Sequence, residues 1–358
     1  MSFDNRINKL KEQFLEYNID SIYVTNLNNV RYLTGFTGSA GSLLVLDHKN
    51  YFFTDGRYTE QSKEQVKNCE ICIVGSAHYL DIKKRKLLKP EVRLGIESPF
   101  VSVHFYDSFK SALPNVKCVK VPDIIGVLSA VKDKYEIESL QTAVDITDEV
   151  FSAIIPELKI GAIEKEISAK ISYLFKIHGA DGDAYDPIVG SGHLGALPHA
   201  RPTQKSFENG DFVVMDFGAL YNGYHADMTR TVVIGDATEK HKEIYDIVLQ
   251  SQLAGIGYAK AGVTGAGLDL ACRSVIEDAG YGDKFIHSTG HGLGLEIHAY
   301  PRISSQNKLP LLENYIITIE PGIYLENWGG VRIEDDCLIK ENTCSPMNKS
   351  TKEMLVLN

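Results

Sequence analysis

The stretch VVMDFGALYNGYHADMTRTVV, residues 213–233, has the pattern of a β-hairpin. Two runs rich in Val, Met, Thr and Tyr flank the dipeptide Asn222-Gly223, which favours a tight two-residue turn. Aspartate is depleted in strands, yet Asp216 and Asp227 each fall within one arm. The two aspartates are therefore unusual for strand positions, and a chemical role would explain them.

The turn also predicts the register of the two arms. With the Asn-Gly dipeptide as the loop, Asp216 lies opposite Thr229 and Gly218 lies opposite Asp227. Side chains alternate between faces, so the two aspartates project from one face as diagonal neighbours, about 7–8 Å apart. Two such carboxylates repel each other unless a cation lies between them, and hard cations prefer oxygen ligands. The alternative is a solvent-facing polar pair on an edge hairpin.

The whole chain has the composition of an ordinary globular protein. Its 358 residues are enough for two domains, and 44% of them are hydrophobic. A net charge of −10, without any run of Lys or Arg, argues against a nucleic-acid partner. Residues 1–20 form an amphipathic pattern without the apolar core of a signal peptide, and no stretch is long enough to span a membrane. We therefore expect a cytoplasmic protein without a membrane partner.

The six cysteines are scattered along the sequence. Cys69 and Cys72 form the one close pair, and neither a second such pair nor a histidine follows at zinc-site spacing. The pattern favours buried thiols in a reducing compartment over a redox or zinc site.

Hydrophobic periodicity divides the chain into two domains. Residues 1–125 alternate helical and strand patterns, which predicts an α/β domain with a mixed sheet. Residues 126–358 begin with a long amphipathic helix from Lys134 to just before Pro156. Further helical patterns then alternate with hairpins, so this second domain is predicted to be α+β, with helices covering a mainly antiparallel sheet.

Histidines gather in FIHSTGHGLGLEIHAYP, residues 285–301. His287, His291 and His298 fall within twelve residues and are interspersed with glycines, which let a backbone approach a ligand closely. A single histidine here would more often be structural, whereas three favour a functional site.

Two later stretches contribute further acids. In YIITIEPGIY, residues 315–324, Glu320 ends an apolar strand, where a carboxylate is costly unless it is paired or metal-bound; the alternative is an exposed strand end. In GGVRIEDDCLIK, residues 329–340, a strand would place Arg332 and Glu334 on one face. Arg332 would then orient a carboxylate ligand or form an ordinary surface ion pair. Together the acids and imidazoles suit a two-metal hydrolytic centre.

These motifs, in this order, resemble the pita-bread metallopeptidases, a family that includes methionine aminopeptidase, prolidase and Xaa-Pro aminopeptidase. The resemblance implies a pseudo-twofold α+β domain with a curved antiparallel sheet, and a creatinase-like α/β domain before it. It also implies two divalent cations, with manganese favoured by the oxygen-rich ligands and cobalt or zinc as alternatives. The implied ligands are Asp216, Asp227, His291, Glu320 and Glu334.

The proline-directed branch of the family is the better match. ALPHARP, residues 196–202, resembles a segment of that branch and places His199 at its active-site histidine. YLTGFTGSAGSLLVL and YFFTDGRYTEQ, residues 32–46 and 51–61, resemble bacterial Xaa-Pro aminopeptidases more than Xaa-Pro dipeptidases. We therefore expect an Xaa-Pro aminopeptidase that forms a homodimer, with an Xaa-Pro dipeptidase as the alternative. A non-catalytic binding module is a remote alternative, because such relatives lack some of the five ligands.

The resemblance also implies a role for each site residue. Asp216 and Glu334 would bridge the two ions, Asp227 would hold one, and His291 with Glu320 the other. The ions would activate the water that attacks the carbonyl preceding proline, and Glu320 would carry a proton from that water to the leaving nitrogen. His199 and His298 would bind the substrate and stabilise the tetrahedral intermediate. The expected substrates are peptides with proline at the second position, and the remaining substrate contacts are expected from His287, Tyr300, Tyr324 and Arg332.

Overall fold

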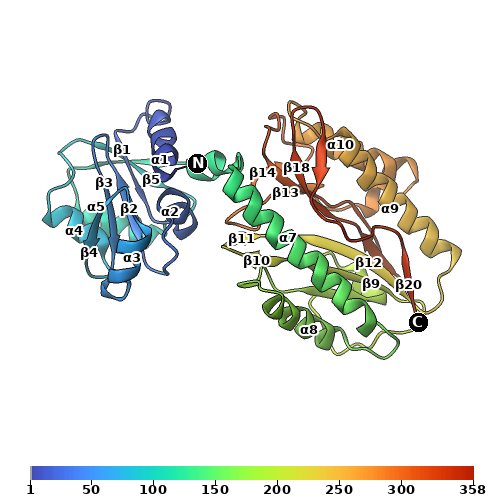
Figure 1. The fold of residues 1–358 in the computed structure, drawn as a ribbon. Helices are drawn as coiled ribbons and strands as arrows, with labels where there is room; N and C mark the ends of the chain where they lie inside the picture. The colour runs from blue at the N-terminus through green and yellow to red at the C-terminus, as the bar shows by residue number, and fades with distance from the viewer. Residues whose placement is uncertain (1) are drawn as a thin grey trace. The chain divides into compact units, whose positions relative to one another are not determined.

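The computed structural model describes residues 2–358, which form two compact units (Figure 1). The first unit ends at Ser129 and the second begins at Ala130. The boundary expected after residue 125 falls inside α6 (Ile124–Ala130). Each unit has its own strands and helices.

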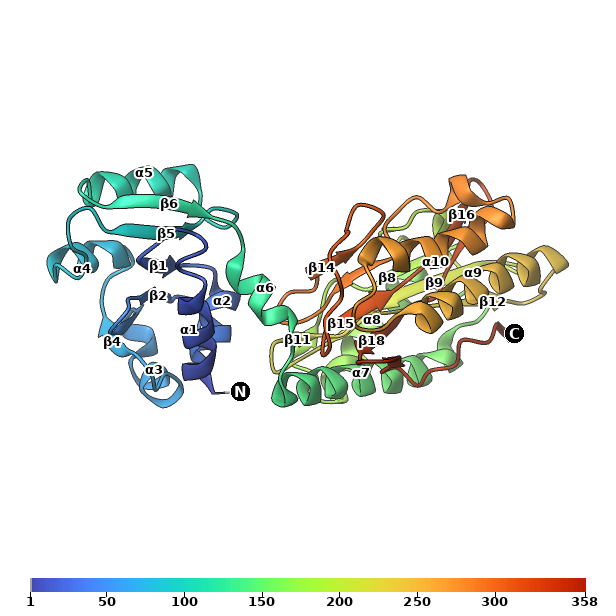
Figure 2. The ribbon, with the colours of Figure 1, turned by 90° about the horizontal axis from the view of Figure 1, so that it is seen from above.

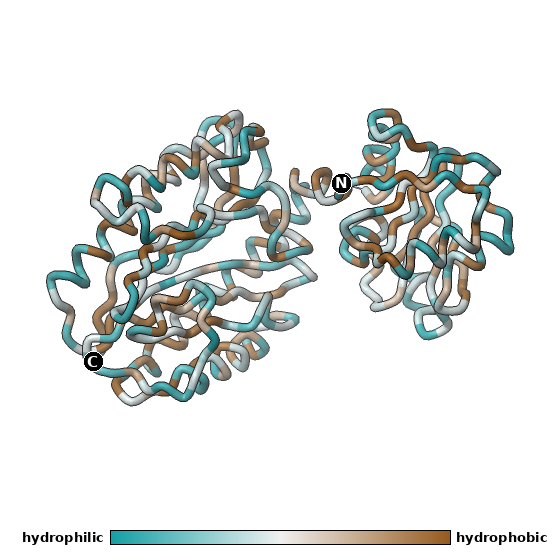
Figure 3. The backbone as a smooth tube through the Cα atoms, turned by 180° about the vertical axis from the view of Figure 1, so that it is seen from behind, coloured by the Kyte–Doolittle hydropathy of each residue, from teal (hydrophilic) through white to brown (hydrophobic). Residues whose placement is uncertain are grey.

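The first unit is built around a six-stranded sheet with the order β4-β3-β2-β1-β5-β6 (Figure 2). Strand β1 pairs antiparallel with β2 and parallel with β5, so the sheet is mixed, as predicted. Figure 3 shows hydrophobic segments along these strands, and Ile22, Leu44 and Phe53 are buried there. Its strands are β1 Ser21–Val24, β2 Ser42–Val45, β3 Asn50–Thr54, β4 Glu70–Ile73, β5 Arg93–Glu97 and β6 Lys117–Val121. Its helices are α1 Phe3–Glu12, α2 Leu27–Thr34, α3 Thr59–Gln65, α4 His78–Lys84 and α5 Val103–Ala112.

The second unit is α+β, as predicted, and most of its strand pairings are antiparallel. Its sheets have the orders β11-β10-β7, β20-β12-β9-β8, β14-β13-β15-β18-β19 and β16-β17. The first strands are β7 Gly182–Asp183, β8 Ile188–Ser191, β9 Phe212–Phe217, β10 Ala219–Tyr221, β11 Tyr224–His225, β12 Met228–Ile234 and β13 Gly290–Gly292. The others are β14 Ala299–Ile303, β15 Ile316–Ile319, β16 Gly322–Leu325, β17 Gly329–Arg332, β18 Asp335–Ile339, β19 Cys344–Pro346 and β20 Leu355–Leu357.

Four long helices cover these sheets in two pairs. They are α7 Lys134–Ile154, α8 Glu164–Ile177, α9 Glu239–Tyr258 and α10 Gly265–Asp278. Helices α7 and α8 share one hydrophobic core with β9 and β12, and α9 and α10 share another with β15 and β18. Representative residues of the two cores are Val144, Phe175, Met215 and Val232, and Ile244, Cys272, Ile317 and Ile339. Within the described residues, no helix is both long and apolar enough to cross a membrane.

Most of the cysteines are buried, as the sequence pattern favours. All six are free, and Cys72, Cys272, Cys337 and Cys344 are buried. Cys69 and Cys118 are partly exposed.

The hairpin has the predicted turn and register. Asn222 and Gly223 adopt φ angles of 48° and 71°, the left-handed conformation that a tight hairpin turn requires. Asp216 pairs with Thr229 across β9 and β12. The local turn chemistry therefore positions the first candidate ligand.

The prediction that each aspartate lies within a strand is wrong for Asp227. Gly218 separates β9 from β10, and Asp227 lies in the gap between β11 and β12. A Cβ atom at Gly218 would lie 1.7 Å from the Ala226 carbonyl oxygen, so the two backbones approach here as only glycine allows. Each arm is therefore divided between two sheets, and Asp227 lies where the second arm passes from one sheet to the other.

Candidate metal centre

A cavity of about 810 Å³ in the second unit collects nearly all of the predicted site residues. All five candidate ligands line it, although they come from segments up to 118 residues apart, between Asp216 and Glu334. The other predicted residues on its wall are His199, His287, His298, Tyr300 and Arg332. Tyr324 does not line the cavity.

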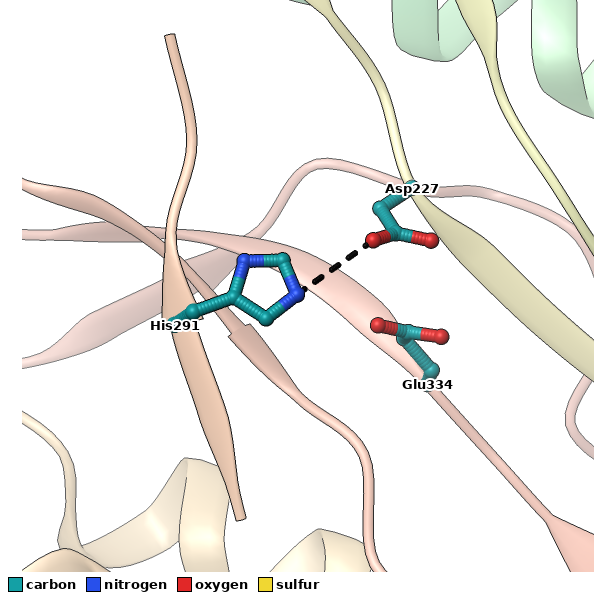
Figure 4. Close-up of side chains that lie close together, drawn as sticks. All are labelled: Asp227, His291 and Glu334. Carbon is teal, nitrogen blue, oxygen red and sulfur yellow. Dashed lines mark ion pairs between the residues drawn. The ribbon is translucent and has the colours of Figure 1, made fainter. Parts of the chain in front are cut away.

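Asp227, His291 and Glu334 form a close group of ligand atoms (Figure 4). One atom from each lies within 4.8 Å of the others. His291 Nε2 is 3.5 Å from Asp227 Oδ2 and also 3.5 Å from Glu320 Oε1. His291 Nδ1 lies 3.1 Å from the Gly292 carbonyl oxygen and donates to it, which leaves Nε2 as the nitrogen facing the carboxylates.

Glu320 and Glu334 both follow the ends of strands. Glu320 comes directly after β15, as predicted. The segment containing Glu334 is not one strand, because β17 ends at Arg332 and β18 begins at Asp335 in another sheet. Glu334 lies in this junction, where its backbone N–H donates to the Thr229 carbonyl oxygen at 3.2 Å. The break directs Glu334 toward the hairpin acids.

Asp216 is held by an arginine and a tyrosine. Arg332 Nη2 donates to Asp216 Oδ2 at 2.6 Å, and Arg332 is 3% exposed, so this is a buried ion pair and not a surface one. The Tyr185 hydroxyl is in hydrogen-bond contact with Asp216 Oδ1 and Asp227 Oδ1. A hydroxyl carries one proton, so it donates to one of these carboxylates at a time.

Within residues 2–358, no cationic side chain is paired with Asp227 or Glu334 in the way that Arg332 is paired with Asp216. Glu334 Oε2 accepts from Thr229 Oγ1 at 2.6 Å, but Glu334 Oε1 is buried and has no hydrogen-bond partner among the described residues. Burial, and then the charge of Asp216, raise the pKa of Asp227 well above its ordinary value. Burial, and then the charge of Asp227, do the same to Glu334. An unpartnered oxygen among four carboxylates and one imidazole fits a divalent cation.

Tyr324 lies apart from the cavity wall and supports it. It is 4% exposed and is not among the residues that line the cavity, so the structure does not place it in contact with substrate. Its hydroxyl accepts from Arg332 Nη1 at 2.7 Å and lies 2.9 Å from His287 Nε2. His287 Nδ1 donates to the Ser288 carbonyl oxygen at 2.8 Å, so Nε2 accepts from Tyr324. Both nitrogens of His287 are thus used within the protein.

His298 and His199 are exposed side chains on the same wall. The His298 ring lies edge-on to His291, with 4.5 Å between ring centroids. Partial desolvation of its ring against the wall lowers the pKa of His298, which favours the neutral ring near pH 7. The structure thus brings two exposed imidazoles beside the carboxylate group.

Comparison with known proteins agrees with this geometry. Residues 138–341 match metallopeptidase family M24, and residues 6–129 match the creatinase/prolidase N-terminal domain. The chain belongs to metallopeptidase family M24. Its second unit has the pita-bread fold of that family, as the sequence resemblance implied.

Relatives of this M24 peptidase match over nearly their entire length. An Xaa-Pro dipeptidase from Pyrococcus furiosus is 41% identical, with 98% of this chain and 99% of the relative covered. The solved structure of an Xaa-Pro dipeptidase from Bacillus anthracis has a TM-score of 0.97 and 38% identity, covering 99% of this chain and 100% of that one. The solved structure of an X-Pro aminopeptidase from Thermotoga maritima MSB8 has a TM-score of 0.88 and 39% identity. It covers 95% of this chain and 98% of that one.

Sequence reasoning missed three supporting residues of this M24 site. Thr229 could have been found from the hairpin register, which sets it opposite Asp216. Thr318 accepts from the backbone N–H of His291 and donates to Glu320 Oε1 at 3.1 Å, and its place two residues before Glu320 on a strand is a weak signal. Tyr185 lies outside every motif, and no pattern pointed to it.

Proposed function

We propose that this chain is a divalent-cation-dependent Xaa-Pro dipeptidase. The observation that carries the proposal is the convergence of four carboxylates and one imidazole on one cavity wall, with a buried Glu334 oxygen left unpartnered. Such a donor set suits cations that activate water for hydrolysis. It occurs in a chain that resembles named Xaa-Pro dipeptidases from end to end.

The dipeptidase is preferred here to the aminopeptidase favoured by the sequence motifs. Those motifs cover two short segments of the first unit, whereas the similarity to Xaa-Pro dipeptidases covers both units. The Xaa-Pro aminopeptidase stays the second candidate, because the Thermotoga maritima structure is similar to a comparable degree. The two candidates share the bond that is cleaved and differ in the length of peptide accepted.

We propose that the five ligand residues hold two divalent cations. The oxygen-rich set with a single imidazole favours Mn²⁺, and Co²⁺ or Zn²⁺ would also fit. When bound, such ions lower the pKa of water and polarise the scissile carbonyl group. The ligands are Asp216, Asp227, His291, Glu320 and Glu334.

Glu320 is the side chain best placed to move a proton. Its Oε1 lies 3.5 Å from His291 Nε2, and its Oε2 lies 3.9 Å from His287 Nδ1. Burial raises the pKa of Glu320 above its ordinary value, so the carboxyl group can hold a proton between two steps. We assign it the transfer from the attacking water to the leaving nitrogen.

His298 and His199 lie on the cavity wall, where we propose that they donate to the substrate. Imidazole N–H groups on the wall can donate to the oxygen that becomes negative as the carbonyl group is attacked. A proline nitrogen carries no N–H, so the site needs no acceptor for it and must only accommodate the ring and protonate the nitrogen as it leaves. Peptides with proline at the second position are therefore the proposed substrates.

Metal removal combined with matched dipeptides tests this function. The purified chain is treated with a chelator, reloaded with Mn²⁺ and assayed on Ala-Pro and Ala-Ala. We expect hydrolysis of Ala-Pro that is lost on chelation and restored by Mn²⁺, with little action on Ala-Ala. Equal activity before and after chelation would contradict the cation-dependent mechanism, and equal rates on both dipeptides would contradict proline specificity.

A homodimer and a cytoplasmic location are also proposed, on the family resemblance. Light scattering of the purified chain tests the first, because a dimer has twice the 39.7 kDa mass of the chain. Cell fractionation tests the second.

A further inference from the structure

Glu164 is a fully buried acid outside the metal centre. It is the first residue of α8 and is 0% exposed. Its Oε1 accepts from the Ser191 backbone N–H at 2.8 Å and from Ser191 Oγ at 2.7 Å. Its Oε2 accepts from the Thr203 backbone N–H at 2.9 Å and from Thr203 Oγ1 at 2.7 Å. One carboxylate therefore joins two points that are distant in sequence.

The segment between these two points carries a predicted substrate-binding residue. We call residues 192–202 the His199 loop, because His199 lies within it and lines the cavity. The Pro198 carbonyl oxygen accepts from Arg332 Nη1 at 3.1 Å, which links the loop to the residue that holds Asp216. The His199 loop is thus fixed by Glu164 at both ends and by Arg332 in its middle.

A carboxylate is the group that this arrangement requires. Its two oxygens offer about four acceptor sites and no donor, which matches two N–H and two O–H donors. A glutamine at position 164 would keep the size of the side chain but could accept at one oxygen only. Its NH₂ group would face the donors of either Ser191 or Thr203, so one end of the loop would lose its two hydrogen bonds to residue 164.

We propose that Glu164 is a positioning residue that sets the His199 loop, and through it the His199 imidazole, against the cavity. The expected effect on catalysis rests on the proposed peptidase function. The anchoring of the loop does not depend on that function. The four hydrogen bonds bracket the loop and involve none of the five ligand residues. Glu164 contacts no ligand residue directly, so we expect it to act on substrate geometry with the cation stoichiometry unchanged.

The test compares Glu164→Gln with Glu166→Gln, an exposed acid in the same first turn of α8. Amide hydrogen exchange of residues 192–202 is measured on the full chain loaded with Mn²⁺. We expect exchange in this loop to speed up by roughly 10-fold in Glu164→Gln, as for the loss of a hydrogen bond to a charged group. We expect no change in Glu166→Gln. Unchanged exchange in Glu164→Gln would overturn the proposal whatever the substrate is.

Activity on Ala-Pro adds a second readout. We expect Glu164→Gln to lower kcat/KM by roughly 10–100-fold, the range for a residue that orients another, with bound Mn²⁺ at the wild-type stoichiometry. In a His199→Ala background the same substitution should cost about 2-fold or less, because both changes act on one group. An equal loss in both backgrounds, or loss of Mn²⁺, would overturn the positioning role.

Two milder variants cover the case in which Glu164→Gln does not fold. Ser191→Ala and Thr203→Val each remove one of the four donors and leave the carboxylate in place. We expect both to speed exchange in the His199 loop and to lower kcat/KM by less than Glu164→Gln would. Wild-type exchange in both variants would contradict the proposal. Failure of the wild-type chain to cleave Ala-Pro would refute the proposed function instead, while exchange still tests the anchoring.

Discussion

The Arg332 guanidinium and the Asp216 carboxylate form a buried ion pair, with 2.6 Å between Nη2 and Oδ2. Arg332 Nε also donates to Thr229 Oγ1 at 2.9 Å, and that hydroxyl donates to Glu334 Oε2 at 2.6 Å. One planar side chain thus orients two of the carboxylates that would hold the cations. This explains why an arginine is buried beside the cavity.

Replacing Arg332 by lysine tests this arrangement. A lysine ammonium is a compact charge that cannot reproduce the fork of donors to Thr229, Tyr324 and Asp216. We expect Arg332→Lys to lower kcat/KM by roughly 10–100-fold while the fold is retained. Steady-state kinetics and circular dichroism check this. Wild-type kinetics in the variant would show that the positive charge alone is sufficient.

Asp227 should be required for cation binding but not for folding. It lies at the junction of β11 and β12, and its side chain faces His291 and Glu334. We expect Asp227→Asn to weaken Mn²⁺ binding and to lower kcat/KM by more than about 100-fold, beyond the loss typical of a group that only orients a ligand. Calorimetric titration with Mn²⁺ measures the binding, with Asp278→Asn, an exposed acid on α10, as the control. Normal affinity in Asp227→Asn would contradict its role as a ligand.

His298 should act on the substrate and not on the metal. We expect His298→Ala to lower kcat by roughly 10²–10³-fold, the range for loss of one donor to a developing oxyanion. Elemental analysis should find the wild-type metal content. His104→Ala, in an exposed position of the first unit, serves as the control. A metal ion missing from His298→Ala would mean that the roles of His298 and His291 are exchanged.

The cation-free chain should lose stability as the pH rises above the ordinary carboxyl pKa of about 4. Burial raises the pKa of Asp227, Glu320 and Glu334, so the folded chain holds protons that the unfolded chain has already released. Stability falls with pH wherever the folded state binds more protons. Burial lowers the pKa of His287 and His291, which gives the opposite slope, but that contribution is complete above their ordinary value of 6.5.

Thermal unfolding of the chelated protein measures this effect. We expect the Tm to fall between about pH 7 and about pH 8.5, above the titration range of ordinary histidines. Saturation with Mn²⁺ should flatten the slope, because the cation takes the place of the protons. A Tm of the chelated protein that rises across this range would contradict the assigned shifts.

The sequence predicted those features of the site that depend on local chemistry. The Asn222-Gly223 turn determined the pairing of Asp216 with Thr229, because a two-residue loop leaves a single register. It could not predict the break at Gly218, since a strand pattern assumes unbroken alternation. That break depends on a close approach to the Ala226 backbone, which is a tertiary contact.

Two other features of the site could not be predicted from the sequence, because they also depend on tertiary contacts. Arg332 and Glu334 were expected on one strand, but the chain changes sheet between them. Tyr324 was expected to contact substrate, yet its hydroxyl is turned to Arg332 and His287. A motif gives the identity of a side chain, whereas the packing of neighbouring elements decides whether it reaches the cavity.

The proposed dipeptidase differs from an aminopeptidase in the length of peptide that it accepts. One kinetic comparison tests this difference most directly. The Mn²⁺-loaded chain is assayed on Ala-Pro and on Ala-Pro-Ala under identical conditions, and kcat/KM is determined for each. A dipeptidase should cleave Ala-Pro with kcat/KM at least about 100-fold above that for the tripeptide, equivalent to roughly 2.7 kcal/mol in the transition state. Equal or faster cleavage of Ala-Pro-Ala would contradict the dipeptidase and establish an Xaa-Pro aminopeptidase.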